Sequence, residues 1–567
     1  MKNIVQLLAI ILTLFIAGCN PKPAAESAIS TDTTAIAAGM LIFNQECSAC
    51  HNFIADGIGP SLGGLTTHEK VDWIKKFISS PKAMMESGDE HAKQIIEKYK
   101  TVMPSFPKLS VGNLNNLVAF INTKKNFDKN AAPVDPNALT NPIPDTIKFS
   151  TLVANIKLFA QIPFSSDENP KTRIVKLDYQ PKTDLLYILD LRGKLYFLNK
   201  GKPEVYFDMT KERKSFIHKP GLATGFGSFA FHPDFEKNGL LYTTHSEPSK
   251  TKKADFNYND TIPSVLQWVV TEWKTTNPAM IPFQGQGREL FRIDFVSGIH
   301  GMQEATFNPY SKTADEDYGL LYIGLGDGGA VETKFPFLAH SRDKLWGTII
   351  RIDPSKRNSK NGNYGIPDTN PFVKDADAAG EIYAYGFRNP HKITWLKSGK
   401  MMASNIGHTN IESFNMIESG HDYGWPIREG TFVHLESGNM NSLYPLPPDD
   451  AKYCITYPVI QFDHTEGKAM SSGYEYTGRE VSALAGKFFY GDIPGGRLFY
   501  SQVKDIVQGK QALVKEWRIA LDGKVMSIEE LCGDKRTDMR IGRDSKGELY
   551  IFTKPDGKLY KIVSAKE

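Results

Sequence analysis

The sequence lacks an excess of charge of either sign. Its 567 residues include 67 lysines and arginines against 64 aspartates and glutamates, which gives a formal net charge of +3. Nucleic-acid-binding proteins usually carry a strongly basic patch or stripe. The balance therefore argues against nucleic acid as a partner.

Long hydrophobic runs are equally scarce. Beyond the N-terminal segment, no apolar stretch approaches the roughly 18 residues that cross a bilayer. Apolar residues still make up 41% of the chain, enough for a large core. The length exceeds that of one ordinary small domain, so more than one domain is expected.

Cysteine is also sparse. The five cysteines divide into one near the N-terminus, one closely spaced pair, and Cys454 with Cys532. The last two could pair in an oxidising compartment, but the sequence does not supply the distance between them. The closely spaced pair carries the strongest functional signal of the chain.

The run at residues 46–51 (Glu-Cys-Ser-Ala-Cys-His) is typical of covalent c-type haem attachment. Two thioether bonds to the porphyrin need cysteines on one short helical turn, here Cys47 and Cys50, and His51 then lies beneath the iron as proximal ligand. A dithiol redox motif or half a zinc site is the alternative. Zinc would need a second ligand pair, and the first 150 residues contain no further cysteine except Cys19. The motif therefore predicts one covalent haem c.

The second axial ligand is expected to be a methionine. Met103, in a Val-Met-Pro-Ser-Phe-Pro run, is the best candidate; Met84, Met85 and His91 lie in a polar stretch and are weaker. Ligation by methionine and histidine leaves no open iron position, which favours electron transfer over oxygen binding.

Residues 36–126 are expected to form a small all-α domain and resemble a class I cytochrome c. A helix precedes Cys47, a loop follows the haem motif at residues 57–64, and a closing helix lies around residues 114–122.

Residues 1–18 read as an export signal, with one early lysine and an apolar stretch at residues 4–16. The Ile-Ala-Gly before Cys19 resembles a lipoprotein cleavage box, so Cys19 is expected to carry a lipid. An ordinary signal peptide with a chance cysteine is the alternative. The expectation is an exported protein, lipid-anchored to a membrane that faces the periplasm or cell surface. Export agrees with haem c, which is attached outside the cytoplasm.

Two segments have the composition of linkers. Residues 19–35 are rich in Pro, Ala, Ser and Thr and read as a tether between the lipid and the first domain. Residues 127–148 contain four prolines and read as the connection to a second, larger domain.

Residues 149–567 carry short strand-like runs that end in Gly and Asp turns. A short apolar segment that contains a tyrosine recurs at residues 185–189, 239–242, 319–324, 381–385, 487–492 and 547–551. Six imperfect repeats at a period of roughly 50 to 100 residues predict an all-β, six-bladed β-propeller. Scarce helical periodicity disfavours a nicotinamide-binding α/β sheet, and the glycine-rich run at 324–329 has no helix after it, so its glycines predict tight turns.

Further phrases in this region keep a fixed order. They lie at residues 231–235 (Phe-His-Pro-Asp-Phe), at His300 with Phe307 and Pro309, and at residues 326–329, 347–354, 385–390, 422–426 and 473–476. In this order and spacing, residues 155–563 resemble the soluble pyrroloquinoline quinone (PQQ) dependent glucose/sorbosone dehydrogenases, also called aldose sugar dehydrogenases.

The resemblance implies roles for several residues. His300 matches the general base that takes the sugar hydroxyl proton, and Asp327 would hold and polarise its ring. Arg388 matches the arginine that faces the PQQ carboxylates, with Asn389 beside it as a hydrogen-bonding partner.

Other cofactor contacts follow from the same resemblance. Arg497 and Lys468 lie near positions where the family places cationic PQQ contacts. Gly407 and His408 fall where backbone carbonyls bind a calcium that activates the quinone, and carbonyl oxygens suit that hard cation.

The sequence also departs from the family. Ala223 stands where relatives often have Gln or Glu, and Ile299 stands where the glucose dehydrogenases have Asp directly before the base. Residues 301–304 read Gly-Met-Gln-Glu where relatives often have Asn-Gly-Gly. The pocket mouth is therefore altered, and glucose is not assumed as the substrate.

Together these features predict a membrane-tethered quinohaemoprotein. The propeller would oxidise an aldose sugar or related alcohol with PQQ, and the fused cytochrome would pass electrons to an external acceptor such as a cytochrome or oxidase. One alternative is a non-catalytic propeller that binds glycans or proteins and is attached to an electron-transfer cytochrome. A haem-linked oxidase with a metal in the propeller is disfavoured because His218, His232, His245 and His300 are widely scattered.

Overall fold

The computed structural model describes residues 29–48, 50–53, 56, 59–99, 103–107, 109–126, 135–218, 220–221, 223–259, 261–436 and 440–567. The expected export signal, the lipidation site Cys19 and residues 127–134 of the linker lie outside them. Among the helices within this range, none is both long enough and apolar enough to cross a bilayer.

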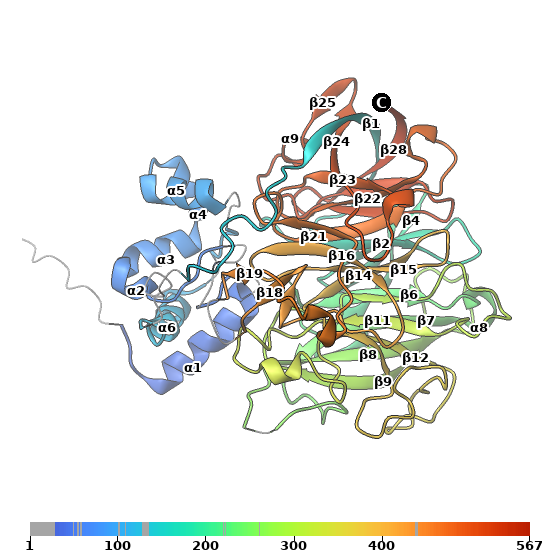
Figure 1. The fold of residues 1–567 in the computed structure, drawn as a ribbon, viewed down its shortest axis with the longest axis horizontal. Coiled ribbons are helices and arrows are strands. Elements are labelled where there is room, and N and C mark those ends of the chain that lie inside the picture. Colours follow the sequence, from blue (N-terminus) through green and yellow to red (C-terminus); the bar gives the residue numbers. More distant parts are fainter. Residues whose placement is uncertain are drawn as a thin grey trace, which may run out of the picture.

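A small helical domain precedes the first strand and lies beside the β-rich part of the molecule (Figure 1). Asp32 caps the first helix by accepting a hydrogen bond from the Ala35 amide, and Ser110 caps the last by accepting one from the Asn113 amide. Its described helices are α1 (Thr33–Ile42), the π-helical turn η1 (Phe43–Cys47), α2 (Leu65–His68), α3 (Val71–Ser79), α4 (Pro81–Glu86), α5 (Glu90–Tyr99) and α6 (Val111–Asn122).

Helices α1 and α6 pack closely because of one glycine. A Cβ atom on Gly39 would lie 1.9 Å from the carbonyl oxygen of Asn116, so any larger residue would push the helices apart. Leu117 and Val118 of α6 are fully buried in the core between these helices. The π-helical turn continues α1 and ends at Cys47, which places the first haem cysteine at the edge of this core.

The remainder of the described chain consists mostly of four-stranded antiparallel blades. The first three blades are β2 (Ile174–Tyr179), β3 (Leu186–Asp190), β4 (Lys194–Asn199) and β5 (Lys202–Asp208); β6 (Phe226–Phe231), β7 (Leu240–Pro248), β8 (Leu266–Lys274) and β9 (Gln286–Phe295); and β10 (Glu304–Thr306), β11 (Leu321–Leu325), β12 (Thr348–Ile352) and β13 (Ile382–Tyr385).

The other three blades complete the ring. They are β14 (Pro390–Trp395), β15 (Met401–Asn405), β16 (Ile411–Ile417) and β20 (Ile460–Asp463); β21 (Met470–Glu475), β22 (Lys487–Asp492), β23 (Leu498–Gln502) and β24 (Lys515–Leu521); and β26 (Arg540–Arg543), β27 (Leu549–Phe552), β28 (Lys558–Lys566) and β1 (Lys148–Gln161).

Strand β1 closes the propeller. It pairs antiparallel with β28 at the C-terminal end and parallel with β24, which joins the last two blades into one sheet (Figure 1). Pairing the first strand of the domain with its last covers edges that would otherwise be exposed. The predicted architecture, a small all-α cytochrome c domain followed by an all-β six-bladed propeller, is confirmed.

Short elements decorate the blades. A small sheet of three strands is inserted between β16 and β20. The sheet consists of β17 (Arg428–Glu429), β18 (Phe432–His434) and β19 (Leu443–Tyr444). The other short elements are β25 (Lys524–Met526), α7 (Met209–Glu212), α8 (Phe235–Asn238), α9 (Ile528–Cys532), and the 3₁₀ turns η3 (Pro336–Leu338), η4 (Asp450–Tyr453), η5 (Ser482–Leu484) and η6 (Val503–Asp505).

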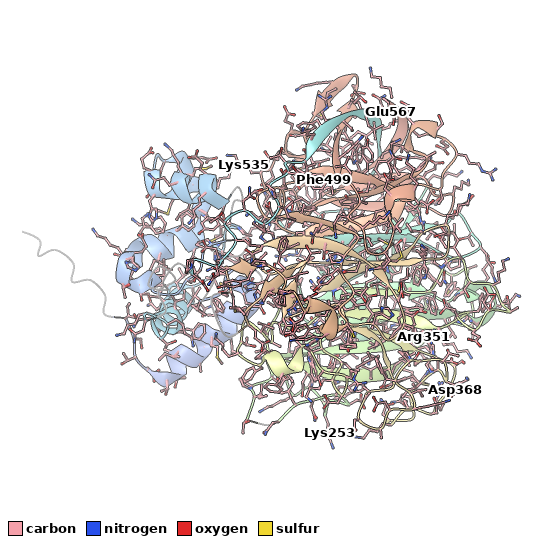
Figure 2. The ribbon with its side chains drawn as sticks, viewed as in Figure 1. Lys253, Arg351, Asp368, Phe499, Lys535 and Glu567 are labelled. Atoms are coloured by element: carbon pink, nitrogen blue, oxygen red, sulfur yellow. The ribbon has the colours of Figure 1, made fainter. Side chains whose placement is uncertain are left out.

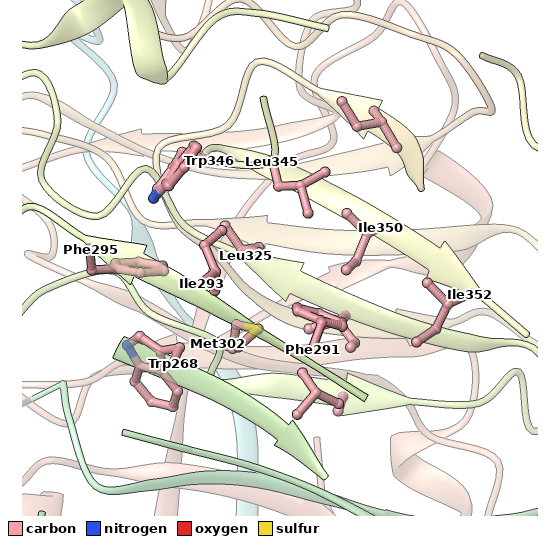
Figure 3. Close-up of a cluster of buried hydrophobic side chains, with 14 of the residues drawn as sticks. Trp268, Phe291, Ile293, Phe295, Met302, Leu325, Leu345, Trp346, Ile350 and Ile352 are labelled. Atoms are coloured by element: carbon pink, nitrogen blue, oxygen red, sulfur yellow. The ribbon is translucent and has the colours of Figure 1, made fainter. Parts of the chain in front are cut away.

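The core lies between neighbouring blades. Figure 3 shows side chains from the second and third blades that interdigitate, among them Trp268, Ile293, Leu325 and Ile350. All four are at most 1% exposed, and each such burial contributes about 1.5–3 kcal/mol. Blade packing of this kind gives the loops at the ends of the strands a rigid base.

Candidate active site and haem-binding site

The four residues predicted to hold the haem line one cavity in the helical domain. Cys47, Cys50, His51 and Met103 surround about 990 Å³ of space, part of it open to solvent. The wall is otherwise mainly apolar and includes Trp73, Ile74, Phe77, Ile78, Ile95, Ile96, Leu117 and Ile121. Two thiols, an imidazole and a thioether in an apolar cavity fit a covalently held haem with His51 and Met103 as its axial ligands.

His51 is oriented for metal ligation. Its Nδ1 donates to the carbonyl oxygen of Pro60 at 2.8 Å, which leaves Nε2 free to bind iron. Burial lowers the pKa of the imidazole, against the opposing effect of the Pro60 hydrogen bond, and so favours the neutral form that binds metals. Gly59 makes room for the ring, because a Cβ there would lie 2.4 Å from its Cε1 atom.

Replacing Met103 with alanine is expected to abolish the near-infrared sulfur-to-iron band of the oxidised haem and to lower its reduction potential. The thioether is the ligand that raises the potential of such haems. Met84→Ala is the matched control, because Met84 does not line the cavity. A band that survives Met103→Ala and disappears in Met84→Ala would show that the ligand has been assigned to the wrong methionine.

A second cavity lies in the propeller, at the side that faces the helices. It encloses about 890 Å³ of space, part of it open to solvent, and loops from several blades contribute to it. Of the residues predicted from the sequence, it brings together His300, Arg388, Asn389, Gly407, His408 and Lys468. The two residues that mark the departure from the family, Ala223 and Ile299, also line it.

His300 is held by the carboxylate of Asp327. Its Nδ1 lies 2.6 Å from Asp327 Oδ1, so Nδ1 donates and Nε2 is left as the basic nitrogen. Asp327 is fully buried, and its other oxygen accepts a hydrogen bond of 2.9 Å from the indole of Trp425. This pairing of base and carboxylate is the one that the sequence predicted.

The backbone around this pair is tightly folded. His300 has a φ of +50°, a left-handed conformation that is uncommon for a residue with a side chain. A Cβ on Gly326 would lie 2.3 Å from the carbonyl oxygen of His300, so only glycine allows the two loops to approach. This contact explains the first glycine of the Gly-Asp-Gly-Gly run.

Arg388 is already paired with a carboxylate that the sequence gave no reason to select. Glu332 Oε1 accepts from Arg388 Nη2 at 2.6 Å and from Nε at 3.1 Å, while Nη1 donates to the carbonyl oxygen of Gly407 at 2.5 Å. Burial alone would raise the pKa of Glu332, but Arg388 and His300 hold it below its usual value. Glu332 lies in a turn without a recognisable motif, so only the structure reveals it.

The cavity lining is predominantly cationic. Besides Lys468 and Arg388, three basic residues that the sequence did not single out line the cavity: Arg536, Arg540 and Lys554. The acidic residues in the lining are Glu332 and Asp538. Arg536 and Asp538 precede β26, and Arg540 is its first residue. No motif in the sequence marks them. Such a lining fits a planar tricarboxylate such as PQQ.

Lys554 is the most perturbed of these groups. Burial, reinforced by the neighbouring Arg540, Arg173 and Arg536, lowers its pKa to about 7 despite the opposing charge of Asp538. Burial is the largest cause of this shift, and the three arginines add to it.

Arg497 lies outside the residues that line this cavity. It binds Glu516 at 2.7 Å and Glu466 at 2.5 Å, in an ion-pair network on β23 and its neighbours. The carbonyl oxygen of Gly407, one of the two expected to hold calcium, accepts a hydrogen bond from Arg388 Nη1. The calcium site at Gly407 and His408 stays a prediction.

Cys454 and Cys532 are unpaired in the described part of the chain. Cys454 is exposed directly after η4, and Cys532 ends helix α9. No disulfide therefore joins Cys454 to Cys532, a pairing that the sequence left undecided.

The two cavities share a wall. Cys50 and His51 line both of them, and so does Arg536 of the propeller, whose Nη1 lies 4.0 Å from Cys50 Sγ. A hydrogen bond of 2.8 Å from the Asp56 amide to Asn441 Oδ1 also joins the domains. Figure 2 labels Lys535, next to Arg536 in the chain, at the edge of the propeller nearest the helices.

Residues 192–561 match the family model described as glucose/sorbosone dehydrogenase. The chain belongs to this family. Residues 34–121 match a second model, described as cytochrome c oxidase, cbb3-type, subunit III. A glucose/sorbosone dehydrogenase domain is thus fused to a cytochrome c domain, as the sequence predicted.

Relatives of the family domain differ in kingdom and in name. The chain is 28% identical over 406 residues to HIPL1 protein of Arabidopsis thaliana, covering 63% of this chain and 55% of that one. It is 25% identical over 257 residues to aldose sugar dehydrogenase YliI of Escherichia coli, covering 43% of this chain and 57% of that one. The chain therefore spans about half the length of the curated relatives it matches.

One solved structure supports the fold. A crystal structure of glucose dehydrogenase has a TM-score of 0.50 at 20% identity and covers 72% of this chain and 99% of its own. At that identity the likeness bears on the propeller fold alone.

Proposed function

We propose that the chain is a quinohaemoprotein that oxidises an aldose sugar or related alcohol with PQQ and passes the electrons to its own haem c. One observation carries the proposal. Cys50 and His51 of the haem site line the same cavity as His300 and Arg388. This shared lining supports a function in which a haem accepts electrons from chemistry that His300 assists.

The residues of the cavity have different roles in the proposed reaction. His300 Nε2 accepts the proton of the substrate hydroxyl, while Asp327 holds the ring and stabilises the imidazolium that results. Arg388, Lys468 and Arg540 bind the carboxylates of the cofactor, which when bound supplies a two-electron acceptor. Asn389, directly after Arg388, contributes a hydrogen-bonding group to the same wall.

The helical domain supplies the acceptor for single electrons. Fusion raises the effective concentration of the haem near the propeller, so electron transfer does not await a diffusional encounter. Arg536 lines both cavities. From the haem the electrons pass to an external cytochrome or oxidase.

The substrate is proposed only as a class. Ala223 and Ile299 are small or apolar residues in the cavity wall, and they remove polar contacts that glucose-specific relatives would offer. We therefore propose an aldose or related alcohol other than glucose as the preferred substrate.

The location of the protein is proposed from the segment before the described residues. We infer that Cys19 carries a lipid and anchors the exported chain to a membrane. Cys19→Ser is expected to release the protein into the soluble fraction of cells. An N-terminal peptide without an acyl mass, from wild-type protein that is itself soluble, would overturn this proposal.

The experiment that tests the function combines calorimetry and spectroscopy. PQQ is titrated into the full-length haem protein, and the haem spectrum is then followed while a panel of sugars, alcohols and aldehydes is added. We expect saturable PQQ binding and haem reduction by at least one sugar or alcohol. Absence of both would favour the rival function, a propeller that only recognises glycans or proteins.

A further inference from the structure

Three buried side chains meet beside the propeller cavity, and one of them, His408, lines it. His408 lies in the turn between β15 and β16, Glu429 ends β17 and His434 ends β18. Each offers a ligand atom, and these atoms all lie within 4.8 Å of one another. The exposed fractions are 5%, 4% and 2%, so water does not reach them freely.

Both imidazoles have a nitrogen without a hydrogen-bond partner among the described residues. His434 Nδ1 donates to the carbonyl oxygen of Pro426 at 2.7 Å, and His408 Nδ1 lies 3.3 Å from the hydroxyl of Thr409. In each ring Nε2 remains buried and without a hydrogen bond; His408 Nε2 lies 3.7 Å from Glu332 Oε1, beyond hydrogen-bond distance. Leaving a buried polar atom unpaired costs about 1–3 kcal/mol, so two of them in one cluster point to a missing partner.

Glu429 is fixed in place as an anion. Its Oε1 accepts hydrogen bonds of 2.8 to 3.1 Å from the four backbone amides of residues 408–411. A carboxyl group that accepts this many N–H bonds is held in its ionised form. Because Oε2 accepts only from the side-chain amide of Asn410, it retains a lone pair for a further partner.

The turn that carries His408 is built around this carboxylate. A Cβ on Gly407 would lie 1.7 Å from the carbonyl oxygen of Ile411 and 2.9 Å from Glu429 Oε1. The glycine thus allows the turn to wrap round the carboxylate and holds the imidazole of the next residue beside it.

The catalytic pair does not offer an equivalent site. His300, Asp327 and Glu332 also lie close together, but His300 Nδ1 is bound to Asp327 and Glu332 to Arg388. Glu332 Oε2 is buried without a hydrogen-bond partner among the described residues, but the guanidinium of Arg388 is bound to the same carboxylate, and its positive charge disfavours a metal ion there. The group of His408, Glu429 and His434 differs in that each of its two imidazoles has a buried Nε2 without a hydrogen bond.

We propose that His408, His434 and Glu429 bind a divalent transition-metal ion of the zinc class. Two imidazoles and one carboxylate match the ligand preferences of such ions and not those of calcium. Metal–nitrogen bonds are about 2.0–2.1 Å, so the ligand atoms need to close in by less than about 1 Å. A ligand position not filled by protein would face the cavity, because His408 lines it.

The test uses the full-length haem protein without PQQ, so that its outcome does not depend on the proposed enzyme function. The protein is stripped with a chelator, titrated with zinc by calorimetry, and assayed for zinc by mass spectrometry. We expect one zinc per chain, not displaced by millimolar calcium. A crystal measured at the zinc absorption edge should place the ion between the three side chains.

Variants separate this site from adventitious binding. His434→Gln and His408→Gln are expected to weaken zinc binding at least tenfold, since each loses one of three ligands. His421→Gln is the matched control, because His421 is partly exposed and pairs with Glu418. The haem spectrum and circular dichroism verify folding. Wild-type protein that binds no zinc, equal affinity in His434→Gln and His421→Gln, or ready displacement by calcium would each overturn the proposal.

Discussion

His300→Ala is expected to lower turnover by about 10² to 10⁴ and to leave PQQ binding largely unchanged. The imidazole is the proposed base, and the buried carboxylate of Asp327, 2.6 Å away, fixes its orientation. Alanine removes the proposed proton acceptor, whereas the cations proposed to hold the cofactor stay in place.

The measurement pairs steady-state rates with calorimetry of PQQ binding on the same preparations. His218→Ala is the control, since His218 is exposed. Added imidazole should restore part of the activity of His300→Ala. Equal activity of the two variants would refute the assignment of the base, and loss of PQQ binding in His300→Ala would instead make it a cofactor-binding residue.

Haem reduction by substrate is expected to proceed at a rate independent of protein concentration. The reason is the shared wall of the two cavities, in which Arg536 lies 4.0 Å from Cys50 Sγ. Transfer within one molecule does not slow on dilution, whereas transfer between molecules does. Stopped-flow absorbance over a hundredfold range of protein concentration distinguishes the two.

Removing residues 1–130 provides the complementary result. The propeller has its own core and closing strand β1, so the truncated chain is expected to fold and still reduce small artificial dyes. It should pass no electrons to a cytochrome partner. Undiminished reduction of that partner by the truncated chain would show that the fused haem is not on the electron path.

Some of the fold followed from local sequence patterns. The haem motif needs only the spacing of Cys47, Cys50 and His51, because covalent attachment happens on a single turn of chain. The repeated strand phrase correctly gave the number of blades, although one copy was misplaced. The phrase at residues 381–385 lies on β13, the outer strand of the third blade, while the corresponding strand of the fourth blade is β15.

The misplacement has a physical cause. An apolar run with a tyrosine is typical of a strand buried between sheets, and the outer strand of the third blade has such a run because Ile382 and Ala384 are fully buried. The pattern of the fourth blade, Met-Met-Ala-Ser-Asn, contains no tyrosine and was therefore overlooked.

In the candidate active site, family phrases led to His300 with Asp327 and to Arg388, which the folded chain brings to one cavity. Glu332, Arg536 and Lys554 were not foreseen. They carry no motif of their own, and they reach the cavity from loops far apart in the chain. Arg497 is the opposite case, because the family resemblance predicted it in the cavity and the structure does not place it there. It forms ion pairs with Glu466 and Glu516 instead.

The sequence by itself determined the two kinds of domain, the haem-attachment residues and the family of the propeller, because each depends on local spacing or on the order of short phrases. Only the tertiary structure decided that the haem site shares a wall with the propeller cavity, and that His408, Glu429 and His434 meet. Those arrangements depend on contacts between distant segments, such as Asp56 with Asn441, that leave no periodic signal in the chain.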